Sequence, residues 1–324
     1  MTTAVPPPRH WLFEPHLFGT ICGLLSAVIY TAANAFLRSV MHCDPVWVSA
    51  VKALPTATLV FPFLVVLARR GKPLAPNWSL VGAIAAAGLA GQVLGNVSFQ
   101  YALTVLGVAL TVPLTLGGMI VAATLLGRIF LHEPVTLRAV FSLTLLLIAI
   151  CVLSLGARDA GQSLADVALT PWQLASGVVA GCLSGLAYAV LNVVIRYTVL
   201  RGMPLPTTLF TVSLMGILAL TTISLARLGG AALLATEPRD LALMLLAGVC
   251  NAVAFLALTK SLQLISVVYV NALNATQATL AAIAGVVLFG EALSPWLAVG
   301  VACTIAGLLI MTRGRKVDEI EVEP

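Results

Sequence analysis

The stretch GTICGLLSAVIYTAANAFLR, residues 19–38, recurs in the second half of the chain as GVVAGCLSGLAYAVLNVVIR, residues 177–196. At one constant shift these polar and small residues coincide: Gly19 with Gly177, Gly23 with Gly181, Ser26 with Ser184, Tyr30 with Tyr188, Asn34 with Asn192 and Arg38 with Arg196. The same shift aligns Glu133 with Glu291. Chance matches of Gly and Ala are common in apolar helices, but paired Tyr, Asn, Arg and Glu are not. The pattern therefore indicates an internal duplication.

The composition places this repeat in a membrane. The chain of 324 residues is 60% hydrophobic and only 9% charged, whereas soluble domains carry about 25% charged residues. A helix needs about 20 mostly apolar residues to cross the hydrocarbon layer. The sequence supplies ten such runs, which predict an all-α integral membrane protein with helices at 17–39, 46–68, 80–102, 107–131, 135–156, 174–196, 205–227, 239–261, 264–290 and 295–312.

Five helices in each copy predict that the two repeats are inverted, because an odd number makes the second copy enter from the opposite side. The expected organisation is an N-terminal tail (1–16), a first five-helix repeat (17–156), a polar linker (157–173), a second repeat (174–312) and a C-terminal tail (313–324). The positive-inside rule favours both tails in the cytoplasm, since basic residues gather at the inner helix ends. These include Arg69, Arg70, Lys72, Arg313, Arg315 and Lys316.

Two blocks extend the pattern beyond the first helices. YALTVLGVALTVPLT (101–115) leads to LGRIFLHEPVT (126–136), and LALTKSLQLISVVYVNAL (256–273) leads to GVVLFGEALSP (285–295). Over residues 17 to 312 the chain resembles the EamA-like members of the drug/metabolite transporter superfamily. The resemblance implies a transporter, an exporter or exchanger of small organic metabolites such as amino acids or drugs, in a bacterial inner membrane.

The chain departs from the family pattern at two places. Lys52 stands where the second helix of the family often has an arginine, and its counterpart in the second half is Phe210. Ala275 follows Asn274, where nucleotide-sugar transporters of the superfamily carry a lysine. A nucleotide-sugar specificity is therefore not adopted, and a nucleotide-sugar or phosphorylated-metabolite exchanger is kept only as an alternative.

Polar side chains within the apolar runs are the candidate substrate-binding residues, because a polar group facing lipid is costly. They form stripes at three- and four-residue steps, which place them on one face of a helix. The alternative is that they join helices to one another without touching substrate. The expected set is Tyr30, Asn34, Lys52, Gln92, Asn96, Gln100, Tyr188, Asn192, Asn271, Asn274 and Gln277.

Charged residues near the helix ends allow two interpretations. Lys52 and Lys260 could pair with an anionic substrate group such as a carboxylate or phosphate, or extend their ammonium groups to the interface. Glu133 and Glu291 are predicted to cap the helix that follows each of them, where a carboxylate meets the positive end of the dipole. The glycines of the first and sixth helices are interpreted as packing residues.

No acidic residue or histidine lies in the middle of a predicted span, so a buried carboxylate proton relay has no candidate. Exchange or facilitated diffusion is therefore expected. The rival class is an intramembrane transferase or protease, but no catalytic set is present, and no ATP-binding lysine motif or metal or cofactor motif appears. The expected partners are a small-molecule substrate and the lipid bilayer, with a homodimer left open and no nucleic acid.

Overall fold

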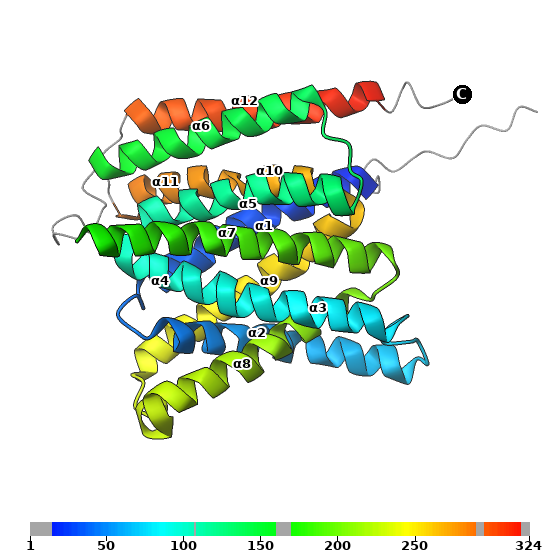
Figure 1. Ribbon diagram of the computed structural model, residues 1–324, viewed down its shortest axis with the longest axis vertical. Helices are drawn as coiled ribbons and strands as arrows, with labels where there is room; N and C mark the ends of the chain where they lie inside the picture. The colour runs from blue at the N-terminus through cyan, green and yellow to red at the C-terminus, as the bar shows by residue number, and fades with distance from the viewer. Residues whose placement is uncertain (1–14, 107, 160–169, 290–294, 319–324) are drawn as a thin grey trace, which may run out of the picture.

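A computed structural model describes residues 15–106, 108–159, 170–289 and 295–318, and every element within these ranges is helical. The helices form one bundle (Figure 1). They are α1 (Pro15–Arg38), α2 (Pro45–Arg69), α3 (Trp78–Ala90), the π-helical segment η2 (Gly91–Asn96), α4 (Val97–Leu106), α5 (Val108–Phe130), α6 (Leu137–Asp159), α7 (Pro171–Leu200), α8 (Leu205–Leu234), α9 (Pro238–Leu264), α10 (Val267–Asn274), α11 (Thr276–Phe289) and α12 (Pro295–Asp318).

These segments make ten membrane-spanning units, because α3, η2 and α4 run on as one helix, and α10 and α11 follow each other across Ala275. The prediction of ten helices in two inverted five-helix repeats is confirmed. Most helix ends lie within four residues of those expected, but α8 and α12 continue seven and six residues beyond their expected ends. Among the described residues, six units are long and apolar enough to cross a bilayer by length and composition alone: α1, α2, the run from Trp78 to Leu106, α7, α8 and α9.

The two halves are interlocked through their first helices. α1 packs along α9 and α10 of the second half, and α7 packs along α4 and α5 of the first half. Glycines make the approach close: a Cβ on Gly23 would lie 2.6 Å from Leu273 Cδ1, and one on Gly177 would lie 2.7 Å from Leu106 Cγ. The interpretation of these glycines as packing residues is confirmed. The polar faces of α1 and α7 are thereby held at the centre of the bundle.

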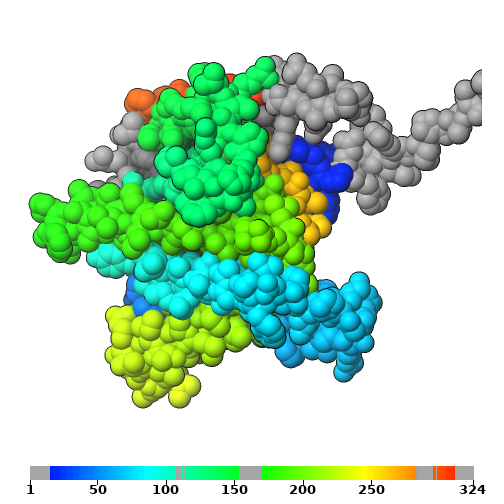
Figure 2. Space-filling view, turned by 45° about the vertical axis from the view of Figure 1, so that its right-hand side comes forward, coloured from blue at the N-terminus to red at the C-terminus, as the bar shows by residue number. Residues whose placement is uncertain are grey.

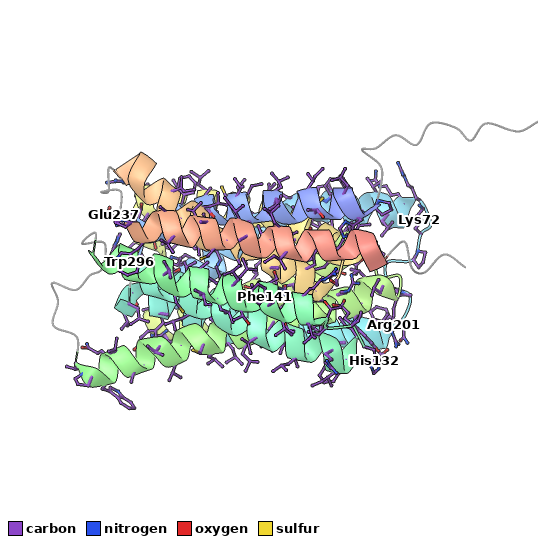
Figure 3. The ribbon with its side chains drawn as sticks, turned by 90° about the horizontal axis from the view of Figure 1, so that it is seen from above. Lys72, His132, Phe141, Arg201, Glu237 and Trp296 are labelled. Carbon is purple, nitrogen blue, oxygen red and sulfur yellow. The ribbon has the colours of Figure 1, made fainter. Side chains whose placement is uncertain are left out.

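The two ends of the bundle differ in the residues they carry. Figure 3 shows Lys72, His132 and Arg201 at one end and Glu237 and Trp296 at the other. The start of α1 and the end of α12 share the end of Lys72, as an even number of crossings requires. On one side of the bundle, the α2–α3 turn and the α8–α9 turn project as two separate lobes (Figure 2).

A polar link joins the two halves at each end. At the end marked by Glu237, His42 Nε2 lies 2.7 Å from Asp240 Oδ2, which connects the α1–α2 turn with α9. At the opposite end, the Glu133 carboxylate pairs with the Arg196 guanidinium of α7. Both links cross from the first repeat to the second.

The prediction that Glu133 caps the next helix along the chain is wrong. Its carboxylate accepts a hydrogen bond from the backbone N–H of Val267, at 3.1 Å to Oε2, and so caps α10 of the other half. In the first turn of α6, Thr136 Oγ1 accepts from Ala139 N at 3.2 Å instead. The reason is tertiary: the positive end of α10 and the Arg196 guanidinium together hold the carboxylate more strongly than one helix end does. Glu291 lies outside the described residues.

Candidate functional site

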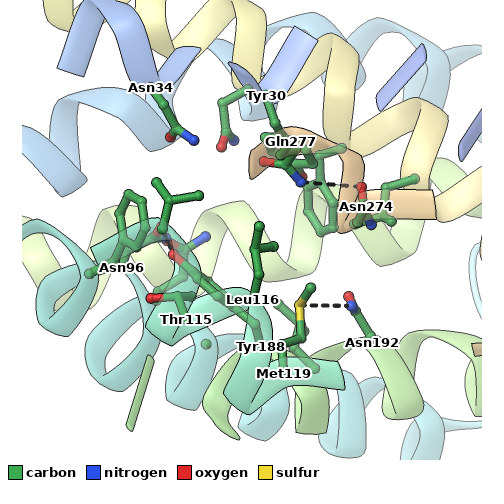
Figure 4. Close-up of a pocket in the computed structure, with 18 of the residues that line it drawn as sticks. Tyr30, Asn34, Asn96, Thr115, Leu116, Met119, Tyr188, Asn192, Asn274 and Gln277 are labelled. Atoms are coloured by element: carbon green, nitrogen blue, oxygen red, sulfur yellow. Dashed lines mark hydrogen bonds between the residues drawn. The ribbon is translucent and has the colours of Figure 1, made fainter. Parts of the chain in front are cut away.

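A cavity of about 130 Å³ lies between the two halves (Figure 4). Its walls come from α1, α2, η2, α4 and α5 of the first repeat and from α7, α8, α9, α10 and α11 of the second. The polar lining consists of Tyr30, Asn34, Lys52, Gln92, Asn96, Thr115, Tyr188, Asn192, Asn251, Asn274 and Gln277. The apolar lining consists of Phe99, Val112, Leu116, Met119, Leu191, Val212, Phe255 and Leu258, together with the backbone of Gly91.

Nine of the eleven residues expected from the sequence line this cavity, and Gln100 and Asn271 do not. Gln100 is 1% exposed, and its Nε2 has no hydrogen-bond partner among the described residues. Asn271 lies in the helix contact behind the wall, where it accepts from Asn192 Nδ2 at 3.0 Å and donates to Val267 O at 2.9 Å. Asn271 therefore joins α10 to α7 and does not line the cavity, which is the alternative interpretation given for the polar residues.

A π-helical turn, η2, interrupts the third span within its polar stripe. The four-residue spacing of Gln92, Asn96 and Gln100 places all three near one face of the helix. Residues 91–96 form a π-helix, which has more residues in each turn than an α-helix. Gln92 and Asn96 within the π-turn reach the cavity, while Gln100, one turn beyond it, lies outside. Such π-turns are frequent at functional sites.

The centre of the polar wall is the side chain of Asn96. Its Oδ1 accepts hydrogen bonds from Lys52 Nζ of α2, at 2.7 Å, and from Tyr188 Oη of α7, also at 2.7 Å. Its Nδ2 donates to Gln92 Oε1 one turn earlier. Both repeats therefore contribute donors to the same amide oxygen.

Close packing of α2 on α9 helps to bury Lys52. A Cβ on Gly248 would lie 2.8 Å from the backbone oxygen of Lys52 and 2.8 Å from Pro55 Cγ, so only glycine permits this approach. The Lys52 residue is 6% exposed. None of the described residues that line the cavity is acidic. Lys260 lies outside the cavity, and its ammonium donates to Gln263 Oε1 at 2.8 Å near the end of α9.

A second polar group lines the part of the cavity formed by α10 and α11. Asn274 Oδ1 accepts from Ser26 Oγ of α1 at 3.1 Å and from Gln277 Nε2 at 3.3 Å. Figure 4 shows Asn274 and Gln277 near Tyr30, and Asn192 near Met119 of α5. This group again joins the two halves, because α1 belongs to the first repeat and α10 to the second.

Two polar lining residues, Asn251 and Thr115, are not in the set expected from the sequence. Asn251 of α9 is the counterpart of Asn96 when the third helices of the two repeats are aligned, so the repeat itself contained the signal. Thr115 of α5 has no such signal, because its counterpart in the second half is apolar. The Thr115 hydroxyl donates to the backbone oxygen of Gly181 at 3.2 Å, a contact that only the packing of α5 on α7 creates.

Comparison with known proteins gives a family and a fold. The model of the EamA-like transporter family matches residues 17–155 and again residues 175–313. A solved crystal structure superposes with a TM-score of 0.72 at 17% identity, over 92% of this chain and 98% of the other, a likeness of fold alone. No curated protein matches the sequence. Since the family model accounts for both repeats, the chain belongs to the EamA-like transporter family, within the drug/metabolite transporter superfamily.

Proposed function

We propose that the protein carries small organic metabolites across a bacterial inner membrane, as an exporter or exchanger, by alternating access. The observation that carries this proposal is the position of the cavity between two inverted repeats, which contribute the equivalent residues Tyr30 and Tyr188 and the equivalent residues Asn34 and Asn192 to it. Inverted repeats around a polar central site are the arrangement that lets two halves rock and expose one site to each side in turn.

Two of the ion pairs between the halves fit this movement. The His42–Asp240 pair and the Glu133–Arg196 pair lie at opposite ends of the bundle, and each joins one repeat to the other. Rocking that opens one end would separate one pair while the other stays formed. Each pair would then act as the closing contact of its own end.

Transport by exchange or facilitated diffusion is favoured over proton coupling. A proton-coupled carrier commonly uses a buried acid or histidine near the substrate. None of the described cavity residues is Asp, Glu or His. Uptake into proteoliposomes that is driven by an imposed pH gradient alone, with no counter-substrate, would contradict this part of the proposal.

Loss of the central hydrogen bonds is expected to impair transport much more than membrane insertion. We expect Asn96→Ala and Tyr188→Phe each to lower the initial rate of counterflow at least about tenfold, because one lost buried hydrogen bond of about 1.4 kcal/mol is a factor of ten. The measurement is saturable counterflow of a labelled panel of amino acids, organic acids and cationic drugs in proteoliposomes.

The matched control for Tyr188→Phe is Tyr101→Phe. Tyr101 is exposed and its hydroxyl contacts Ser176 Oγ at 2.9 Å, away from the cavity. Loss of the Tyr101 hydroxyl should leave the counterflow rate unchanged. If wild-type protein shows no saturable counterflow with any member of the panel, or conducts without saturation as a channel does, the proposed function is refuted.

Both termini are proposed to lie in the cytoplasm, which places Lys72 on the inner side and Glu237 on the outer side. In a background whose six native cysteines are serine, we expect Glu237→Cys to react with an impermeant maleimide on intact cells. Lys72→Cys should react only after permeabilisation. The opposite labelling pattern would reverse the orientation.

A further inference from the structure

We propose that the substrate is an amphipathic carboxylate, whose carboxylate group is held jointly by Lys52 and Tyr188 and whose apolar body fills the rest of the cavity. This proposal rests on the transport function proposed above and names its substrate class.

The first argument is the charge of the cavity. Lys52 Nζ is buried and points to a neutral amide oxygen, and among the described residues no carboxylate forms an ion pair with it. A buried ammonium is costly unless an opposite charge meets it. The described lining holds no acid that could supply that charge, so the complementary anion must come from what binds there.

The second argument is the convergence of two donors. Lys52 Nζ and Tyr188 Oη both lie 2.7 Å from Asn96 Oδ1, and they come from different repeats. A carboxylate has two strongly accepting oxygens and can receive both donors, whereas the amide offers them a single neutral oxygen. Rotation of the Asn96 side chain would release both donors. The Asn96 oxygen thus marks the position that a carboxylate oxygen would take.

The number of cations distinguishes a carboxylate from a phosphate. Lys52 is the one cationic side chain among the described residues that line the cavity. One ammonium balances the single charge of a carboxylate, while a phosphate monoester carries about two charges near pH 7 and is usually held by several donors with arginine. The same lining has no acid for a substrate ammonium. A carboxylate without a free amino group is therefore favoured over an amino acid.

The body of the substrate is defined by the apolar walls. Phe99 and Phe255 line the cavity together with aliphatic residues and Met119, which suits an aromatic or branched hydrocarbon group. On the wall formed by α10 and α11, Asn274 and Gln277 supply amides that can bind one further polar, uncharged group.

Four compounds that share one aromatic body test the proposal: 3-phenylpropanoate, 3-phenylpropanamide, phenylalanine and phenethylamine. We expect purified protein in detergent, measured by calorimetry and thermal shift at pH 7.4, to bind the propanoate at least tenfold more tightly than the other three. Lys52→Met should remove this preference, and Tyr188→Phe should weaken propanoate binding severalfold. Lys260→Met, the matched control outside the cavity, should leave the affinity unchanged.

The ranking with wild-type protein needs no variant, so the test holds even if Lys52→Met fails to fold. Equal or tighter binding of the amide, the amine or phenylalanine, or absence of propanoate binding, overturns the proposal. So does propanoate binding that is unchanged in a folded Lys52→Met protein. Counterflow separates the two proposals. Saturable transport of neutral or cationic substrates without propanoate binding would refute the carboxylate substrate but leave the transport function standing. Lysine-dependent propanoate binding without counterflow of any substrate refutes only transport.

Discussion

Replacing Arg196 with methionine is expected to cost about 3–5 kcal/mol of stability, because it leaves the Glu133 carboxylate buried without its cation. The guanidinium pairs with Glu133 and also donates to the backbone oxygens of Leu262, at 2.7 Å, and Ile265 at the end of α9. One side chain therefore joins α7 to the α5–α6 connection, to the end of α9 and, through Glu133, to the first turn of α10. The measurement is the free energy of unfolding in detergent, with the thermal midpoint as a second readout.

Arg201→Met, directly after the end of the same helix, is the matched control. Arg201 is exposed and stacks over the Tyr197 ring at 4.2 Å, so its loss should change stability by no more than about 0.5–1 kcal/mol. The double variant Glu133→Gln with Arg196→Met should lose less than the sum of the two single variants, because the charges are coupled. Additive losses, or equal losses for Arg196→Met and Arg201→Met, would show that the buried pair contributes nothing.

Replacing Gly185 with alanine is expected to have a comparable effect through packing alone. A Cβ at this position would lie 2.4 Å from the backbone oxygen of Thr115 and 2.8 Å from the backbone nitrogen of Met119. Backbone atoms cannot rotate away, so α5 and α7 must separate. We expect a loss at or above the upper end of usual overpacking costs, about 3 kcal/mol, and a fall in counterflow because both helices line the cavity.

Gly82→Ala is the control for this variant. Gly82 lies in α3 with nothing within 4 Å of an added Cβ, so alanine should be neutral or stabilising by up to about 1 kcal/mol. Unfolding free energies of the two variants, measured under the same conditions, give the comparison. A Gly185→Ala protein as stable as Gly82→Ala would contradict the close contact of α5 and α7.

Most of the site could be predicted because a polar side chain has few favourable places in a membrane helix. Tyr30, Asn34, Tyr188 and Asn192 were predicted from the repeat and its helical period, and the structure places all four around the cavity. Gln100 was misplaced because a helical period gives the direction of a side chain but not how far the cavity extends along the helix. The π-turn of residues 91–96 was not predicted either, because no residue pattern in the sequence marks it.

The sequence by itself determined the ten spans, the inverted duplication and the inward position of most of the polar residues. The physical reason is that a span must be long and apolar enough to cross the hydrocarbon layer, and that a polar group facing lipid is costly. Only the tertiary structure decided which faces meet. It places Lys52 and Tyr188, from different halves, at one oxygen of Asn96. It also places the Glu133 carboxylate against Arg196 and the start of α10, and not at the start of α6. These contacts join residues far apart in the chain. Their energies depend on distances between helices, which the spacing of residues along one helix does not give.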